Sequence, residues 1–71
     1  MPKPVWLKRI LRVLGNKGFY FVSQNGSHMK YRRNGRSAFN VIVPVHGREV
    51  PHGTFRSILR QSGLSQENFV E

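Results

Sequence analysis

Two Asn-Gly dipeptides limit what the middle of this chain can fold into. Asn25-Gly26 and Asn34-Gly35 stand a few residues apart, and glycine in such pairs accepts the positive φ angles of tight turns. The residues around them are β-branched, aromatic or alternately polar and apolar, as in strands. The sequence therefore predicts three short consecutive antiparallel strands, the first beginning with Phe19–Val22 and the third spanning Ala38–Val45.

The distribution of polar and apolar residues selects the second turn. A three-residue loop, Asn34–Arg36, pairs Tyr31 with Phe39 and Met29 with Val41, whereas a two-residue loop would set polar residues opposite apolar ones. We predict the three-residue loop, which also sets Lys30 beside Asn40 and Arg32 beside Ala38. The parity of the first turn stays open, because the first strand is apolar on both faces.

Helical patterns flank the strands. After Pro4, apolar residues at near-helical spacing predict an amphipathic helix that ends at Gly15 or Gly18; they are Val5, Trp6, Ile10, Val13 and Leu14. Trp6 lies on this stripe, so we expect it to anchor the core. Thr54 is the expected N-cap of a second helix that ends at Gly63, and Ser65 is the expected cap of a short final helix.

Size and composition point to one α+β domain over residues 1–71, with helices on one face of a three-stranded antiparallel sheet. The 71 residues include no cysteine, which excludes disulfides, thiolate metal sites and a cysteine nucleophile. The three histidines have no metal-ligand spacing and acids are scarce, so we expect no metal and no cofactor. No apolar run approaches the roughly 20 residues that span a bilayer, and we expect a cytoplasmic protein without membrane contact.

The charge is strongly unbalanced. Twelve Lys and Arg against three acids give a net charge of +9, and no carboxylate precedes Glu49. Such a field attracts polyanions and accelerates their encounter with the protein. The sequence therefore indicates a nucleic-acid partner, although an acidic protein could use the same field.

One histidine lies within a cationic strand. Alternation along the second strand puts His28, Lys30 and Arg32 on one face and Met29 and Tyr31 on the other. Imidazole exchanges protons near neutral pH, and neighbouring cations would hold a phosphate beside it. A phosphodiester is the expected substrate.

Further motifs resemble those of a known family. They are Gly18-Phe19, Gly26-Ser27-His28, Tyr31-Arg32, Val43-Pro44-Val45-His46-Gly47 and the run from Gly53 to Ser65. Together they resemble the HicA toxins, small mRNA interferases of type II toxin–antitoxin systems. The resemblance covers nearly the whole chain from the first helix onward. It implies metal-independent cleavage of mRNA, a HicB-type antitoxin partner, and a catalytic role for His28. The predicted order of helix, three antiparallel strands and helix is also that of the double-stranded-RNA-binding fold.

The remaining candidate residues surround His28 on the basic strands. The expected RNA-contacting set is Gly26, Ser27, Lys30, Arg32, Arg33 and Asn40. A second acid or base, the cleavage preference and the oligomeric state are left undetermined. Two alternatives stay open: a noncatalytic RNA-binding module, and a small basic DNA-binding protein, which the strands between the helices disfavour.

Overall fold

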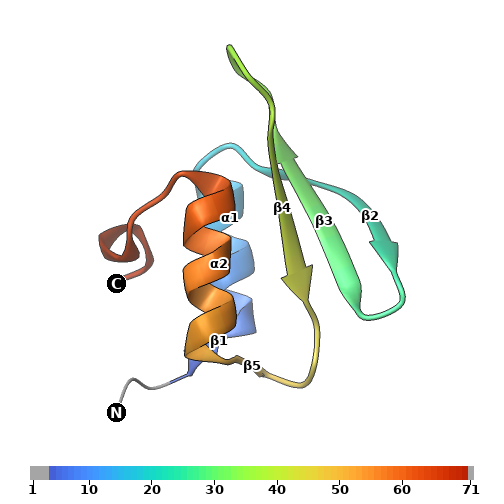
Figure 1. Cartoon of the computed structure of the whole chain (residues 1–71), viewed down its shortest axis with the longest axis vertical. Helices are drawn as coiled ribbons and strands as arrows, with labels where there is room; N and C mark the ends of the chain where they lie inside the picture. The colour runs from blue at the N-terminus through green and yellow to red at the C-terminus, as the bar shows by residue number, and fades with distance from the viewer. Residues whose placement is uncertain (1–3, 71) are drawn as a thin grey trace.

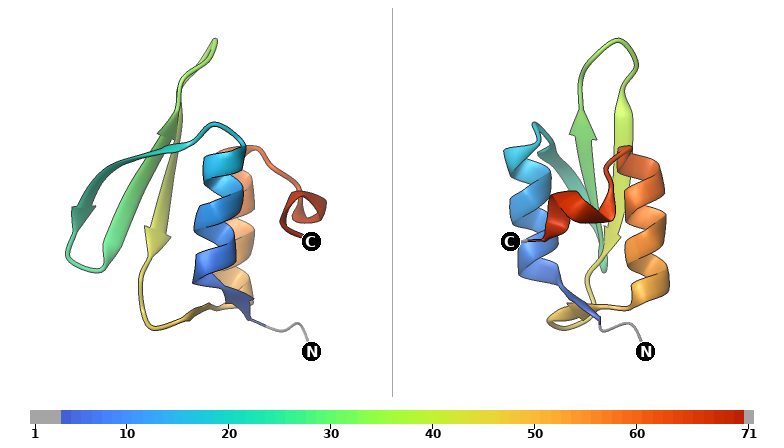
Figure 2. Two further views of the ribbon diagram at one scale, coloured as in Figure 1. Left: turned by 180° about the vertical axis from the view of Figure 1, so that it is seen from behind. Right: turned by 90° about the vertical axis from the view of Figure 1, so that its left-hand side faces the viewer.

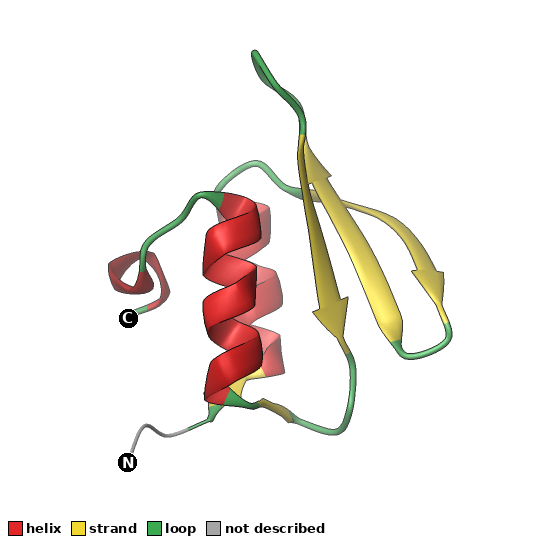
Figure 3. Ribbon diagram, viewed as in Figure 1, coloured by secondary structure: helices red, strands yellow, loops and turns green. Residues whose placement is uncertain are grey.

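The computed structural model describes residues 4–70 and has an α+β architecture (Figures 1 and 3). The elements in chain order are β1 (Val5–Trp6), α1 (Leu7–Asn16), β2 (Tyr20–Asn25), β3 (His28–Arg33), β4 (Phe39–Pro44), β5 (Glu49–Val50), α2 (His52–Ser62) and the 3₁₀-helix η1 (Gln66–Phe69). The predicted order of helix, three antiparallel strands and helix is confirmed. The pairing of β1 with β5 is an addition that the sequence patterns did not reveal.

The molecule is layered. β2, β3 and β4 form an antiparallel sheet in that order, α1 and α2 lie on one face of it, and η1 crosses the helix pair on the side away from the sheet (Figure 2). The core lies between sheet and helices and contains Ile10, Val13, Leu14, Phe19, Val41, Val43, Val50, Phe55, Ile58 and Phe69. The other face of the sheet is left open to solvent.

The register between β3 and β4 differs from the predicted one by two residues. Tyr31 pairs with Val41 and Arg33 with Phe39, so residues 34–38 form a five-residue connection in place of the predicted three. The face assignments survive, because a shift of two residues preserves the side on which each side chain lies. A packing contact accounts for the shift: the Arg33 guanidinium carbon lies 4.8 Å from the ring centre of its cross-strand partner Phe39.

The first turn is now defined. Asn25 pairs with His28, so Gly26 and Ser27 form a two-residue turn in which Gly26 has a φ of 61°. A bulge at Val22 shifts the β2 register between Phe21 and Ser23. Because β2 changes face at this bulge, no single parity describes the whole strand.

The prediction for Trp6 was wrong. Val5 and Trp6 form β1, which pairs with Val50 and Glu49, and the helix begins only at Leu7. The side chain of Trp6 is 50% exposed. A strand points successive residues to opposite sides, so Val5 packs on the core while Trp6 faces outward.

The second helix begins earlier than predicted. Pro51, not Thr54, is its N-cap residue, and proline's fixed φ suits the start of a helix. The predicted end is confirmed, because Gly63 adopts a left-handed conformation with φ of 72°. Ser65 caps η1, as predicted, in a capping box with Asn68. No helix within residues 4–70 has the length and apolar character needed to cross a bilayer.

Candidate active site and nucleic-acid interface

His28 opens β3 at the end of the molecule where β4 finishes and α2 starts (Figure 1). The Gly26-Ser27 turn immediately precedes it, and the carbonyl of Ser27 accepts the Val45 N–H at 2.6 Å. This bond extends the ladder past the strand ends and fixes the backbone just before the histidine. His28 is exposed on the solvent face of the sheet, opposite Pro44.

An open groove of about 400 Å³ runs from His28 to α2. Its strand side consists of His28, Ile42 and Pro44, which all belong to the solvent face of the sheet. Its helix side consists of Gly53, Thr54, Ser57 and Gln61. The groove therefore brings the predicted catalytic histidine against a helix that the sequence analysis did not connect with it.

Gln61 fixes the helix wall of the groove. Its side-chain carbonyl accepts the backbone N–H of Ile42 at 2.9 Å, and its amide donates to the Ser57 hydroxyl at 3.2 Å. The first bond satisfies an N–H on the outer edge of β4 that would otherwise point away from the sheet. Gln61 thus holds both α2 and the Ser57 side chain in place beside the strand.

The start of α2 adds positive potential to the groove. No side chain caps the N-terminus of this helix, which begins one residue before the groove-lining Gly53. The first N–H groups of a helix carry a partial positive charge. They reinforce the electrostatic effect of the strand cations.

Lys30 and Arg32 share the solvent face with His28, as the alternation predicted. Arg32 lies opposite Asn40 and donates a hydrogen bond from Nε to the Asn40 side-chain oxygen at 2.9 Å. This bond orients the guanidinium across the sheet. Lys30 lies opposite Ile42, the strand residue that forms part of the groove.

Arg33 is separated from these cations. Its guanidinium carbon lies 5.0 Å from the ring centre of Phe19 and 4.8 Å from that of Phe39. It also donates to the Lys17 carbonyl at 3.4 Å. Arg33 thus ties the α1–β2 connection to the sheet from the helix side.

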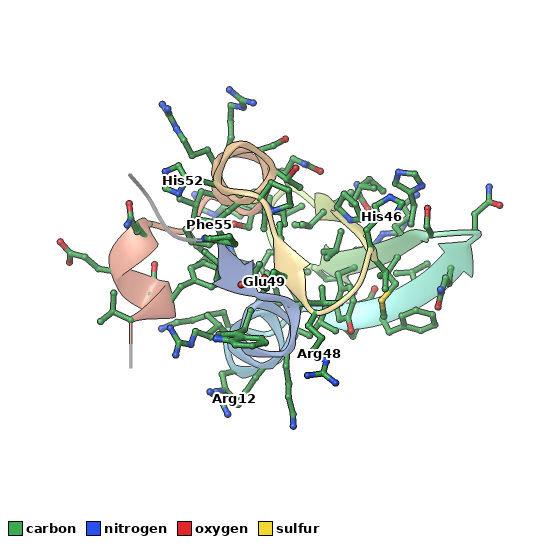
Figure 4. All side chains as sticks on the ribbon, turned by 90° about the horizontal axis from the view of Figure 1, so that it is seen from below. Arg12, His46, Arg48, Glu49, His52 and Phe55 are labelled. Carbon is green, nitrogen blue, oxygen red and sulfur yellow. The ribbon has the colours of Figure 1, made fainter. Side chains whose placement is uncertain are left out.

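The other two histidines belong to different segments from His28. His46 follows β4 and His52 begins α2, and Figure 4 shows the two on opposite sides of the same end of the molecule. The His52 ring packs 6.2 Å from that of Phe55, whereas the imidazole of His28 bonds to no other side chain within residues 4–70. In that range no three His, Asp or Glu side chains gather closely enough to hold a metal ion.

Cations also lie elsewhere on the surface. Arg12 and Arg48 project from the α1 side of the molecule, away from α2 (Figure 4). Arg56 and Arg60 are exposed on α2. The positive field therefore extends beyond the groove around much of the molecule.

Tyr31 has a shifted pKa. Burial raises its pKa above the usual value of 10.0. Its ring meets that of Phe21 edge to face at 5.9 Å. Tyr31 belongs to the helix side of the sheet, which agrees with its predicted place in the core.

The sequence analysis missed the groove residues of α2. Thr54, Ser57 and Gln61 recur at intervals of three and four, which is the spacing of one helical face. This polar stripe was the sequence feature that could have pointed to these residues. Because an exposed helix carries such a stripe in any case, only the packing of α2 beside β4 reveals its position at His28.

The fold, the cationic sheet face and the adjoining groove define a small cationic α+β protein suited to anionic partners. A family model described as "HicA toxin of bacterial toxin-antitoxin" matches residues 7–64. The match covers both main helices and the whole three-stranded sheet. The chain belongs to the HicA toxin family and is a toxin that pairs with an antitoxin. A search of curated proteins finds no match to this chain.

Proposed function

We propose that this toxin is a metal-independent endoribonuclease that cleaves mRNA in the cytoplasm, with His28 transferring a proton in the reaction. The observation that carries the proposal is the position of His28, exposed on the same sheet face as Lys30 and Arg32 and at one end of the groove. The resemblance of the Gly26-Ser27-His28 motif to the HicA toxins supports it, because that resemblance implies a catalytic role for His28. The +9 charge supplies attraction for RNA.

In this reaction the ribose 2′-oxygen attacks the adjacent phosphorus and the bond to the 5′-oxygen breaks. A base removes the 2′-hydroxyl proton and an acid protonates the departing 5′-oxygen, each transfer contributing about 10²–10⁴ to the rate. His28 performs one of these transfers, and the partner group is unassigned. Lys30 and Arg32 stabilise the added negative charge on phosphorus.

Gly26 and Ser27 have a backbone role in this proposal. Gly26 supplies the positive φ of the turn, and Ser27 anchors the turn to Val45 through its carbonyl. Asn40 orients Arg32 from across the sheet. Arg33 is left out of the RNA-contacting set, because its guanidinium packs between two phenylalanine rings on the other side.

A HicB-type antitoxin is the proposed inhibitor, and it covers the His28 face. An acidic protein surface there would meet the cations that hold the RNA phosphates. Occlusion of the groove then stops cleavage without any change in the fold of the toxin.

The decisive experiment compares His28→Ala with His52→Ala on a long single-stranded transcript in EDTA, since the His52 ring packs on Phe55 and lies outside the groove. We expect His28→Ala to bind RNA like the parent but to cleave at least about 10² more slowly, while His52→Ala cleaves normally. The products should carry a 2′,3′-cyclic or 3′-phosphate and a 5′-hydroxyl. Equal cleavage by His28→Ala would remove this residue from the mechanism, and intact RNA bound to the parent would indicate a noncatalytic RNA-binding module.

A further inference from the structure

We propose that the groove between His28 and α2 holds one nucleobase of the RNA strand next to the cleaved phosphate, and that Ser57, positioned by Gln61, reads the edge of that base. This inference rests on the proposed ribonuclease function. It adds a specificity-determining residue that lies on the helix rather than on the basic strands. Three features of the groove carry it.

The first feature is an apolar surface in a polar setting. Ile42 is 39% exposed on the solvent face of the sheet, where its neighbours include Lys30 and Arg32. Pro44 continues the apolar surface beside His28. Apolar side chains with a few placed polar groups are typical of ligand sites, and this surface is suited to the flat face of a base.

The second feature is a hydrogen-bonding group of fixed orientation. The Gln61 carbonyl accepts from Ile42, which directs its amide nitrogen to Ser57. Because the Ser57 oxygen accepts that bond, its own O–H is left to donate. The backbone of β4 thus determines, through Gln61, where Ser57 presents a donor in the groove.

The third feature is the location. One groove includes both His28 and Ser57. A phosphate held at His28 by the strand cations leaves the attached nucleoside close to Ile42 and α2. Single-stranded RNA is read in this manner, through unstacked bases whose edges form hydrogen bonds with side chains. Ser57 therefore contacts acceptor atoms on the edge of the base.

The test uses single-stranded RNA with a randomised region, cleaved by the full-length parent, by Ser57→Ala and by the control Ser37→Ala. Ser37 is exposed in the β3–β4 connection and is absent from the groove. Sequencing of the products gives the base frequencies on either side of each cut. Alanine has a higher helix propensity than serine, so Ser57→Ala should fold.

We expect the parent and Ser37→Ala to share a base preference at a position adjoining the cut. Ser57→Ala should reduce that preference at least about threefold, as for the loss of one hydrogen bond, and should cleave the disfavoured sequences within about twofold of the parent. An unchanged preference, an equal loss at all sequences, or no preference in the parent would overturn the proposal. A parent that leaves all RNA intact would instead contradict the ribonuclease function, and the base-reading role would fall with it.

Discussion

Gln61 bonds to the backbone of Ile42 and thereby closes the outer edge of β4 against α2. The backbone of β4 gives a reason for this position. Ile42 and Pro44 both direct their backbone nitrogens away from β3, since residues of one parity face the same edge in an antiparallel pair. Pro44 has no N–H to satisfy there, so Ile42 is the residue that needs a partner beside the groove.

Two substitutions of Gln61 test its effect on fold stability separately from its effect on RNA binding. Gln61→Ala should lower the free energy of unfolding by about 1 kcal/mol, because the Ile42 N–H and the Ser57 hydroxyl both lose a partner. Gln61→Glu keeps an acceptor for the Ile42 N–H, so its free energy of unfolding should lie closer to that of the parent. Its negative charge should nevertheless weaken RNA binding. Urea unfolding and RNA-binding titrations measure the two effects. Equal stability of the parent and Gln61→Ala would show that the bond contributes nothing.

Substitution of Arg32 should slow RNA cleavage more than substitution of a cation outside the sheet does. Arg32→Glu places a negative charge beside the proposed phosphate site and breaks the bond to Asn40, so we expect slower cleavage at limiting RNA. Arg36→Glu, in the exposed 34–38 connection, changes the net charge equally. Cleavage rates at low and high salt distinguish the variants, because salt screens general attraction. Identical losses would indicate that only net charge matters.

The same substitution should affect the antitoxin. If an acidic surface of the inhibitor covers the His28 face, Arg32→Glu should slow association, with a deficit that shrinks at high salt. Stopped-flow mixing of toxin and antitoxin measures this rate. Chemical labelling of the Lys30 amine provides the map: unchanged reactivity of Lys30 in the complex would rule out inhibition by direct occlusion.

The raised pKa of Tyr31 leads to a prediction for the stability of the fold at alkaline pH. Burial raises its folded-state pKa, so the folded state holds the phenol proton more tightly than the unfolded state does. Its contribution is fully present below pH 10.0, the usual pKa, and is lost as pH rises through the folded-state value. Tyr31→Phe should show a smaller loss of stability than the parent between about pH 9 and 11. Parallel pH profiles of the two proteins would contradict this assignment.

Two glycines should respond to alanine in opposite directions. Gly63 has a φ of 72°, and an added Cβ would lie 2.9 Å from the Phe39 ring, so Gly63→Ala should destabilise the fold by about 1 kcal/mol or more. Gly15 is helical and an added Cβ meets nothing within 4 Å, so Gly15→Ala should stabilise it by about 0.5–1 kcal/mol. Thermal unfolding of both variants checks the signs. A stabilising Gly63→Ala would mean that the cap and Phe39 adjust without strain.

The faces of the sheet could be predicted because the alternation of side chains depends only on neighbouring residues in the chain. Alternation with a period of two placed His28, Lys30 and Arg32 on one face, and the observed register bears this out. Loop length is less strongly encoded, so the connection between β3 and β4 was predicted two residues too short. The stacking of Arg33 between Phe19 and Phe39 depends on segments that meet only in the folded chain.

Long-range contacts also account for the other differences. Trp6 reads as helical from its neighbours, and only the pairing of β1 with β5 assigns it to a strand. The helix wall of the groove was missed for the same reason. Ser57 and Gln61 have no local signal that separates a groove from an ordinary solvated face.

The division of the groove between β3, β4 and α2 has a consequence during protein synthesis. The ribosome makes α2 after both strands, so a nascent chain that already carries His28 still lacks Ser57 and Gln61. The complete groove cannot assemble until α2 has left the exit tunnel and packed beside β4. A fragment that ends before α2 therefore carries His28 but lacks the helix wall of the groove.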